Sequence, residues 1–297
     1  MSLKQEKMSV SFHEHWTPAK DGLRLYWREY GADSPLDKTP LLCLTGLTRN
    51  AKDFHFLAKR YAGTRKVICP DYRGRGLSEY DKEWQHYTPY IYTEDMQCLL
   101  AACGIERVVV IGTSLGGVVA MVLAMECPAL LAGVVLNDVG PVIDTSSLRP
   151  IIDRLGADRP QTDWDGAVRE TQRMFPNLVL PSEKAWLAMA QSTFRAGTDG
   201  VLHVDWDVNL FRPLREETSF TDLWLEATVA SAFQALGPVP TLALRGETSD
   251  VLSRATFERM ADAKPDLVRV TIPGAGHAPH LREPQSLAAL DCFLAMV

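Results

Sequence analysis

The sequence predicts an α/β protein built on a mainly parallel sheet with helices on both faces. Short apolar runs recur along the chain and alternate with helical segments, which is the pattern of strands joined by crossover helices. Most runs are continuous in Val, Ile and Leu, as expected of strands buried on both faces. Hydrophobic residues make up 46% and charged residues 23% of the 297 residues, a composition typical of globular proteins.

Eight strands are predicted, and the first two form a hairpin. Asp21 and Gly22 separate these two strands, and an Asp-Gly pair favours the tight turn that a hairpin needs. The other six strands are the short apolar runs. The predicted strands span residues 10–16, 23–30, 41–44, 66–69, 107–111, 133–136, 241–244 and 268–272.

Two helices between the strands have clear signals. Thr88 is a good N-cap and is followed by Pro89 at the first helical position, while Gly104 ends the same helix. Residues 115–125 are apolar nearly all round, which predicts a helix buried against the sheet.

The alternation stops between residues 141 and 237, where helix signals continue and few strand signals remain. Ser182 is a predicted N-cap there, and Ser219 or Thr221 is another. We therefore divide the chain into a core of residues 1–140 and 238–297 and a helical cap of residues 141–237. Such an insertion would cover the carboxyl ends of the strands, where open α/β sheets bind ligands.

A nucleophile motif follows the predicted strand that ends at residue 111. Residues 112–116 read Gly-Thr-Ser-Leu-Gly, which matches G-x-S-x-G between a strand and an apolar helix. The sharp turn holds Ser114 in a strained conformation with its hydroxyl exposed, and the two glycines keep side chains out of the crowded positions. The following helix directs its amides and its positive dipole towards the oxygen that becomes charged. Ser114 is therefore the predicted nucleophile.

The chain resembles the α/β-hydrolase superfamily, in its branch of capped esterases and C–C hydrolases. The resemblance covers most of the chain outside the cap and implies a mostly parallel eight-stranded sheet flanked by helices, with a helical cap inserted after the sixth strand. The segments that carry it are Leu-Thr-Gly-Leu at 44–47, Asp-Tyr-Arg-Gly-Arg-Gly-Leu-Ser at 71–78, the motif at 112–116, Gly-His-Ala-Pro at 276–279 and Glu-Pro at 283–284.

A base and an acid are needed to activate a serine hydroxyl. The resemblance places the base at His277, which directly follows a glycine after the last strand, and His280 is its rival. For the acid, two aspartates follow strands: Asp250, in the usual position of the family, and Asp138, which some relatives use. We favour Asp250 and keep Asp138 as the alternative acid.

The oxyanion hole requires two backbone amides. One is expected from Leu115, directly after the nucleophile, and the other from Leu47, with Thr48 as an alternative. The family's usual His-Gly pair is replaced here by Thr45 and Gly46, so the histidine's support for this loop is missing.

Three arginines near these motifs have two interpretations each. Arg73 and Arg75 are more typical of a structural corner than of an anion site. Residues 45–48, which include the expected amide of Leu47, are called the oxyanion loop below. Arg49, beside this loop, is either a group that recognises a substrate carboxylate or a solvated surface charge.

The predicted function is hydrolysis of an ester, thioester, lactone or amide bond through an acyl-serine intermediate. Tryptophans in the cap favour a small apolar substrate, although aromatic residues at helical spacing more often pack a core. Two alternatives remain. One is hydrolysis of a C–C bond in a ring-fission product, and the other, from a different class, is a ligand-binding protein on the same fold.

Composition excludes several other classes. The net charge of −6 and the scattered Lys and Arg residues argue against nucleic-acid binding, and no apolar run is long enough to cross a membrane. No nucleotide, flavin or metal motif is present, so no cofactor or metal is expected. Six dispersed cysteines without zinc-ligand spacing indicate buried free thiols in a reducing compartment, which predicts a cytoplasmic protein. We expect a monomer or homodimer.

Overall fold

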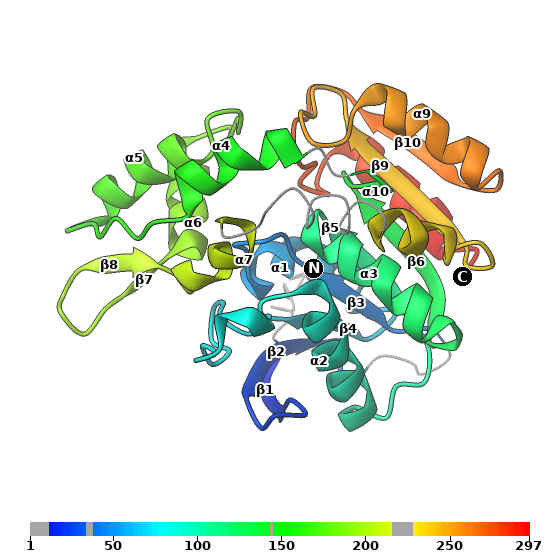
Figure 1. The fold of residues 1–297 in the computed structure, drawn as a ribbon, viewed down its shortest axis with the longest axis horizontal. Helices are drawn as coiled ribbons and strands as arrows, with labels where there is room; N and C mark the ends of the chain where they lie inside the picture. The colour runs from blue at the N-terminus through cyan, green and yellow to red at the C-terminus, as the bar shows by residue number, and fades with distance from the viewer. Residues whose placement is uncertain (1–11, 34–37, 143–144, 216–227) are drawn as a thin grey trace, which may run out of the picture.

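A computed structural model describes residues 12–33, 38–142, 145–215 and 228–297. Its centre is an eight-stranded sheet in the order β1-β2-β4-β3-β5-β6-β9-β10 (Figure 1). The pairs β1–β2 and β2–β4 are antiparallel and all later pairs are parallel. The mostly parallel sheet expected from the sequence is therefore confirmed.

The eight predicted strands are all present, with bounds that differ from the prediction by a few residues at most. Strand ends are the least certain part of a sequence-based prediction, because flanking residues with the same propensity extend or shorten a strand. The observed strands are β1 Phe12–Pro18, β2 Arg24–Tyr30, β3 Leu41–Leu44, β4 Val67–Pro70, β5 Val108–Thr113, β6 Leu131–Asn137, β9 Thr241–Gly246 and β10 Val268–Ile272.

The continuous apolar strands supply two separate cores, one on each face of the sheet. In β3, Leu42 and Leu44 belong to one buried cluster, and Leu41 and Cys43 belong to the other. Successive side chains point to opposite faces of a strand, so a strand covered on both sides must be apolar at every position. The first cluster includes residues of α2 (Pro89–Ala102) and α3 (Leu115–Glu126), and the second includes residues of α1 (His55–Tyr61) and α10 (Pro284–Leu294).

The two helices with clear sequence signals form as predicted. The Thr88 hydroxyl accepts a hydrogen bond from the amide of Ile91, and Pro89 is the first residue of α2. Helix α3 is buried along most of its length, since it packs against β3, β5 and β6 at the centre of the sheet.

Between β6 and β9 the chain leaves the sheet. The inserted elements are α4 Thr145–Leu155, α5 Trp164–Met174, α6 Glu183–Thr193, β7 Phe194–Ala196, β8 Leu202–Val204, η4 Val208–Phe211 and α7 Arg212–Arg215. Helices α4 to α6 and the β7–β8 hairpin lie together on one side of the sheet (Figure 1). Ser182 caps α6 as predicted. The predicted cap residues Ser219 and Thr221 lie outside the described residues.

The insertion is attached to loops at the carboxyl ends of β3 and β4. The Asn50 side chain donates to the carbonyl of Ser192 at 2.9 Å, and the amide of Gly76 donates to the carbonyl of Asp205 at 2.9 Å. Tyr87 donates its hydroxyl hydrogen to the Asp207 carboxylate at 2.7 Å. These bonds hold the insertion beside the loops that surround the predicted nucleophile.

Two further expectations concern surfaces and thiols. No helix among the described residues combines the length and the apolar character that crossing a membrane requires. All six cysteines are free, but only Cys43 and Cys69 are buried, and Cys292 is exposed.

Candidate active site

Ser114 occupies a strained turn between β5 and α3. Its backbone has φ 51° and ψ −114°, a region that non-glycine residues rarely adopt. Both neighbouring glycines are required by close packing. A Cβ on Gly112 would lie 2.3 Å from the carbonyl oxygen of Gly116, and a Cβ on Gly116 would lie 2.1 Å from that of Leu44. The predicted glycine–serine motif thus makes the tight strand-to-helix turn that exposes the hydroxyl.

His277 is the histidine that meets the serine. Its Nε2 lies 3.0 Å from the Ser114 Oγ, and the loop that carries it follows β10. The rival His280 lies three residues further on, where its backbone amide donates to the Glu283 carboxylate at 2.7 Å. The structure therefore brings together the two residues that sequence reasoning paired.

Asp138 is the carboxylate beside the histidine. Its Oδ2 lies 2.7 Å from the His277 Nδ1, and its side chain is fully buried. Two more donors reach the same carboxylate: the amide of Gly246 at 2.8 Å and the hydroxyl of Ser249 at 2.6 Å. These bonds offset the cost of removing a carboxylate from water.

The structure does not bring Asp250, the favoured acid, to His277; the alternative Asp138 lies there. Asp250 is exposed, and none of the hydrogen bonds between described residues joins it to His277. The reason lies one residue earlier, where Ser249 turns inward and donates to Asp138. The loop after β9 thus supplies donors to the acid instead of the acid itself, and Asp250 faces solvent.

Asn137 is a site residue that sequence reasoning missed. It is fully buried, and its side-chain amide donates to the Thr113 hydroxyl at 3.0 Å and to the Pro279 carbonyl at 2.8 Å. Its own carbonyl accepts the Ser114 amide at 3.0 Å. Asn137 therefore ties the nucleophile turn to the histidine loop. The available signal was a polar residue at the end of an otherwise apolar strand.

The contacts define the proton positions for an ionised Asp138 and a neutral His277. A carboxylate only accepts hydrogen bonds, so the His277 Nδ1 must donate to Asp138. In a neutral imidazole the other nitrogen is then an acceptor, so Nε2 receives the hydrogen bond of the Ser114 hydroxyl. This arrangement can remove the proton of Ser114 when its oxygen attacks an electrophile.

The expected oxyanion donors lie beside the serine and are not used elsewhere. A Cβ on Gly46 would be 3.9 Å from the Ser114 Cβ, so the loop after β3 passes in contact with the nucleophile. The amides of Leu47, Thr48 and Leu115 make no hydrogen bond to any group of the described chain. Both predicted donors, Leu47 and Leu115, and the alternative Thr48 remain available for a charged oxygen.

The loop has its own supports in place of the family's histidine. The Thr45 hydroxyl donates to the Arg49 carbonyl at 3.1 Å, and the Arg49 amide donates to the Gly46 carbonyl at 3.1 Å. Arg75, which is fully buried, donates from Nε to the Leu47 carbonyl at 2.9 Å. Since the N–H and C=O of a trans peptide point in opposite directions, bonds to the Gly46 and Leu47 carbonyls also orient the amides of Leu47 and Thr48.

Removing one of these supports should affect turnover more than stability. We expect Thr45→Val, which keeps the side-chain shape, to lower kcat about tenfold with little change in KM, because the loss of about 1 kcal/mol of hydrogen bonding loosens the amide donors. Steady-state kinetics on a short ester would measure this. Thr64→Val is the matched control, since it removes a hydroxyl-to-carbonyl bond of the same 3.1 Å length at the end of α1. Equal kinetics for the two variants would contradict the role of Thr45.

Arg49 matches neither interpretation drawn from the sequence. It is 9% exposed, and its guanidinium makes two bonds to Asp53, at 2.6 and 2.7 Å. It also donates to the Thr193 hydroxyl at 2.8 Å and to the Ser192 hydroxyl at 2.6 Å. These bonds occupy the donors that would bind a substrate carboxylate, so Arg49 links the oxyanion loop to α6.

Arg73 and Arg75 are structural, as the sequence favoured. Arg73 forms a two-bond pair with Asp95, at 2.8 and 2.6 Å, inside the protein. The Arg75 guanidinium lies 4.7 Å from the ring centre of Tyr92 and also donates to its hydroxyl.

The aromatic residues of the inserted segment differ in burial. Trp206 and Phe194 are buried, Trp164 is exposed, and Trp224 lies outside the described residues.

Comparison with known proteins places the chain among hydrolases. The sequence profile described as the alpha/beta hydrolase family matches residues 41–290. The chain is 32% identical over 276 residues to a 3-hydroxybutyrate-oligomer hydrolase of Cupriavidus necator, covering 91% of this chain and 92% of the relative. It is 28% identical over 258 residues to a 2-(acetamidomethylene)succinate hydrolase of Mesorhizobium japonicum, covering 86% and 87%.

A solved structure agrees in fold over nearly the whole chain. The crystal structure of an alpha/beta hydrolase from Novosphingobium aromaticivorans matches with a TM-score of 0.85 and 40% sequence identity. The match covers 97% of this chain and 99% of the other.

Proposed function

Since the chain belongs to the alpha/beta hydrolase family, we propose that it is a serine hydrolase that cleaves an ester through an acyl-serine intermediate. The observation that carries the proposal is the continuous hydrogen-bonded chain from Asp138 through His277 to Ser114. A protein that only binds ligands has no use for a strained serine aligned with a buried carboxylate and an imidazole.

The chemistry follows from the proton positions. His277 Nε2 takes the proton as the Ser114 oxygen bonds to the carbonyl carbon, and the charged oxygen is stabilised by the amides of Leu115 and Leu47. The protonated imidazole then gives its proton to the leaving alcohol as the C–O bond breaks. Water repeats the sequence on the acyl-serine, and Asp138 holds the imidazole in place and stabilises the imidazolium in both steps.

The substrate class is the finer part of the proposal. The relative from Cupriavidus necator is named for oligomers of 3-hydroxybutyrate, which are short hydroxyacyl esters. We therefore place short-chain esters first, with thioesters, lactones and amides as further substrates of the same chemistry. Cleavage of a C–C bond in a ring-fission product uses the same three residues and remains the alternative.

Residues 141–237 are proposed to act as the cap of this site. The support is that Arg49 and Asn50, directly after the oxyanion loop, make hydrogen bonds to Ser192 at the end of α6. A cap tied to this loop would exclude water from the charged oxygen, which strengthens electrostatic stabilisation of the transition state.

Covalent labelling tests the proposal directly. The wild-type protein should react with a fluorophosphonate, gain one adduct in intact mass, and carry it on Ser114 in the digested protein. The same preparation should hydrolyse p-nitrophenyl acetate and butyrate, and dimers of 3-hydroxybutyrate. An adduct on another residue, or no adduct and no ester turnover, would refute the assignment. Loss of dienone absorbance from a ring-fission product without ester turnover would favour the C–C alternative.

A further inference from the structure

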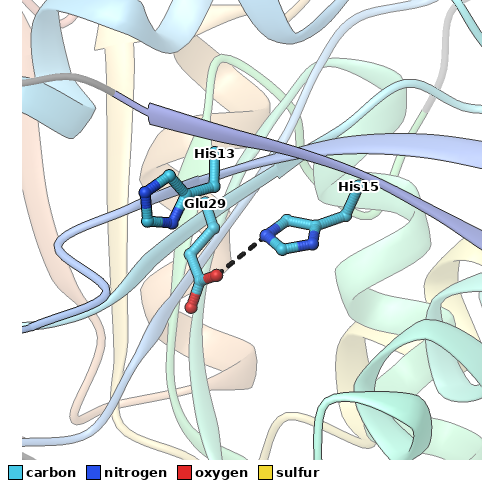
Figure 2. Close-up of side chains that lie close together, drawn as sticks. All are labelled: His13, His15 and Glu29. Carbon is cyan, nitrogen blue, oxygen red and sulfur yellow. Dashed lines mark hydrogen bonds and ion pairs between the residues drawn. The ribbon is translucent and has the colours of Figure 1, made fainter.

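Two histidines and a glutamate meet on the outer hairpin of the sheet, far from Ser114. His13 and His15 lie two residues apart on β1, so their side chains project from the same face of the strand. On β2, Glu29 is the direct cross-strand partner of His13. One ligand atom from each of the three residues lies within 4.8 Å of the other two. Figure 2 shows both rings on the same side of the strand as the carboxylate.

We propose that His13, His15 and Glu29 form a binding site for a divalent transition-metal ion, with Zn²⁺ as its probe. The donor set of two imidazole nitrogens and one carboxylate oxygen is one that Zn²⁺ accepts, with a fourth position left for water. Ligands around tetrahedral Zn²⁺ lie about 3.4 Å apart, given bonds of about 2.0–2.1 Å. The three ligand atoms must move closer than their present separations of up to 4.8 Å, and His13 is exposed on the surface of the hairpin.

One oxygen of the Glu29 carboxylate is directed at the proposed site. Lys66 binds the Oε1 atom at 2.6 Å, whereas Oε2 faces the His15 Nε2 at 2.9 Å. One carboxylate oxygen is thus held by the lysine and the other is directed at the imidazole.

The histidine is held as well. The ring of His15 stacks on Trp27, its cross-strand partner, with ring centres 4.2 Å apart and planes at 18°. Stacking restricts rotation of the ring, so less conformational entropy is lost when a metal binds. His13 completes the site from the solvent side, which gives an ion a path of entry.

A second cluster of possible ligands in the described chain shows why this one was chosen. Asp21, Asp81 and His86 also come close together. There, however, Arg73 donates from one nitrogen to the Oδ2 of Asp21 at 2.8 Å and to the Oδ2 of Asp81 at 2.6 Å. A guanidinium already occupies the position of a cation, so a metal ion has no place in that cluster.

The site is remote from the nucleophile. Between β1 and β5 lie β2, β4 and β3, which at the usual strand spacing corresponds to roughly 20 Å. The ion would therefore join two strands of the outer hairpin without touching the reacting groups, and the proposal is independent of the function of Ser114.

Competition with a fluorescent zinc indicator measures the binding directly. The full chain, free of any affinity tag and treated with EDTA, is titrated with ZnCl₂ in a buffer that does not bind metals. We expect His13→Ala and His15→Ala each to weaken the tightest Zn²⁺ binding at least tenfold. Mutating even the partners of metal ligands lowers metal affinity by about 10–100-fold. His86→Gln is the matched control, because it removes a histidine from the cluster occupied by Arg73, and should bind as the wild type does.

Two further measurements keep the proposal open to refutation if a variant is unstable. Lys66→Met removes a positive charge next to the carboxylate, and we expect several-fold tighter Zn²⁺ binding from the lost repulsion. Zn²⁺ should also raise the Tm of the wild type by a few degrees but not that of His15→Ala, since an ion that binds only the folded state stabilises it. Equal affinity in the wild type, His13→Ala and His15→Ala would overturn the site, as would weaker binding in Lys66→Met.

Discussion

Replacement of Ser114 by alanine is expected to lower kcat for a short ester by about a million-fold, the loss seen when a triad serine is removed. The variant lacks the oxygen that bonds to the acyl carbon, so His277 and Asp138 have no nucleophile to activate. The fluorophosphonate adduct should disappear with the activity. Stopped assays with high enzyme concentration and intact-mass analysis would measure both losses.

Stability is the control for that result. Alanine at residue 114 must adopt the same strained backbone, so we expect little change in Tm relative to the wild type. Ser253→Ala is the matched variant: it removes the N-cap of α9 (Arg254–Ala263), which costs about 1 kcal/mol of stability, and leaves the site untouched. Ester turnover that persists in Ser114→Ala would transfer the nucleophile to another residue.

The second large effect is expected at the acid. Asp138→Asn should lower kcat about ten-thousand-fold, because an amide that donates to His277 Nδ1 stabilises the wrong tautomer of the imidazole and leaves Nε2 carrying a proton. The same change disturbs the bonds from Gly246 and Ser249, because an amide accepts at one oxygen only. We therefore expect a loss of about 1–3 kcal/mol in the free energy of unfolding, measured with urea.

Asp250→Asn is the matched comparison for Asp138→Asn. The Asp250 side chain lies in the loop after β9 and is exposed. The kcat and the free energy of unfolding of the Asp250→Asn variant should therefore stay close to those of the wild type. A larger loss of kcat in Asp250→Asn than in Asp138→Asn would contradict the position of the acid. The pair of variants differs in location and not in chemistry, which isolates the contact with His277.

Much of the fold is predictable from local patterns in this chain. Runs such as Leu41–Leu44 are apolar at every position because successive side chains enter different cores, so the strand and its burial on both faces are visible together. Thr88 and Pro89 mark the start of α2: the Thr88 side chain accepts a hydrogen bond from the Ile91 amide, three residues further along the chain. Signals of this kind depend only on neighbouring residues along the chain, so they can be recognised without knowledge of the tertiary structure.

The insertion after β6 was predictable as an interruption but not in its detail. The hairpin β7–β8 consists of two strands of three residues each, and a pattern with period two cannot be recognised over so short a length. Just after β8, Asp205 and Asp207 accept hydrogen bonds from Gly76 and Tyr87 of the core. These contacts join residues more than a hundred positions apart in the chain.

The order of the candidate catalytic residues along the chain can be read from the sequence alone. A serine in a turn between two glycines comes first, then the candidate acids, and then a histidine after the last strand. Which aspartate lies against His277 is visible only in three dimensions, because it depends on which way the loop after β9 turns. Ser249 points inward to Asp138, and this single orientation places Asp250 in solvent. In the same way, the bond from Arg75 to the Leu47 carbonyl supports the oxyanion loop across the fold, a role that no pattern along the chain reveals.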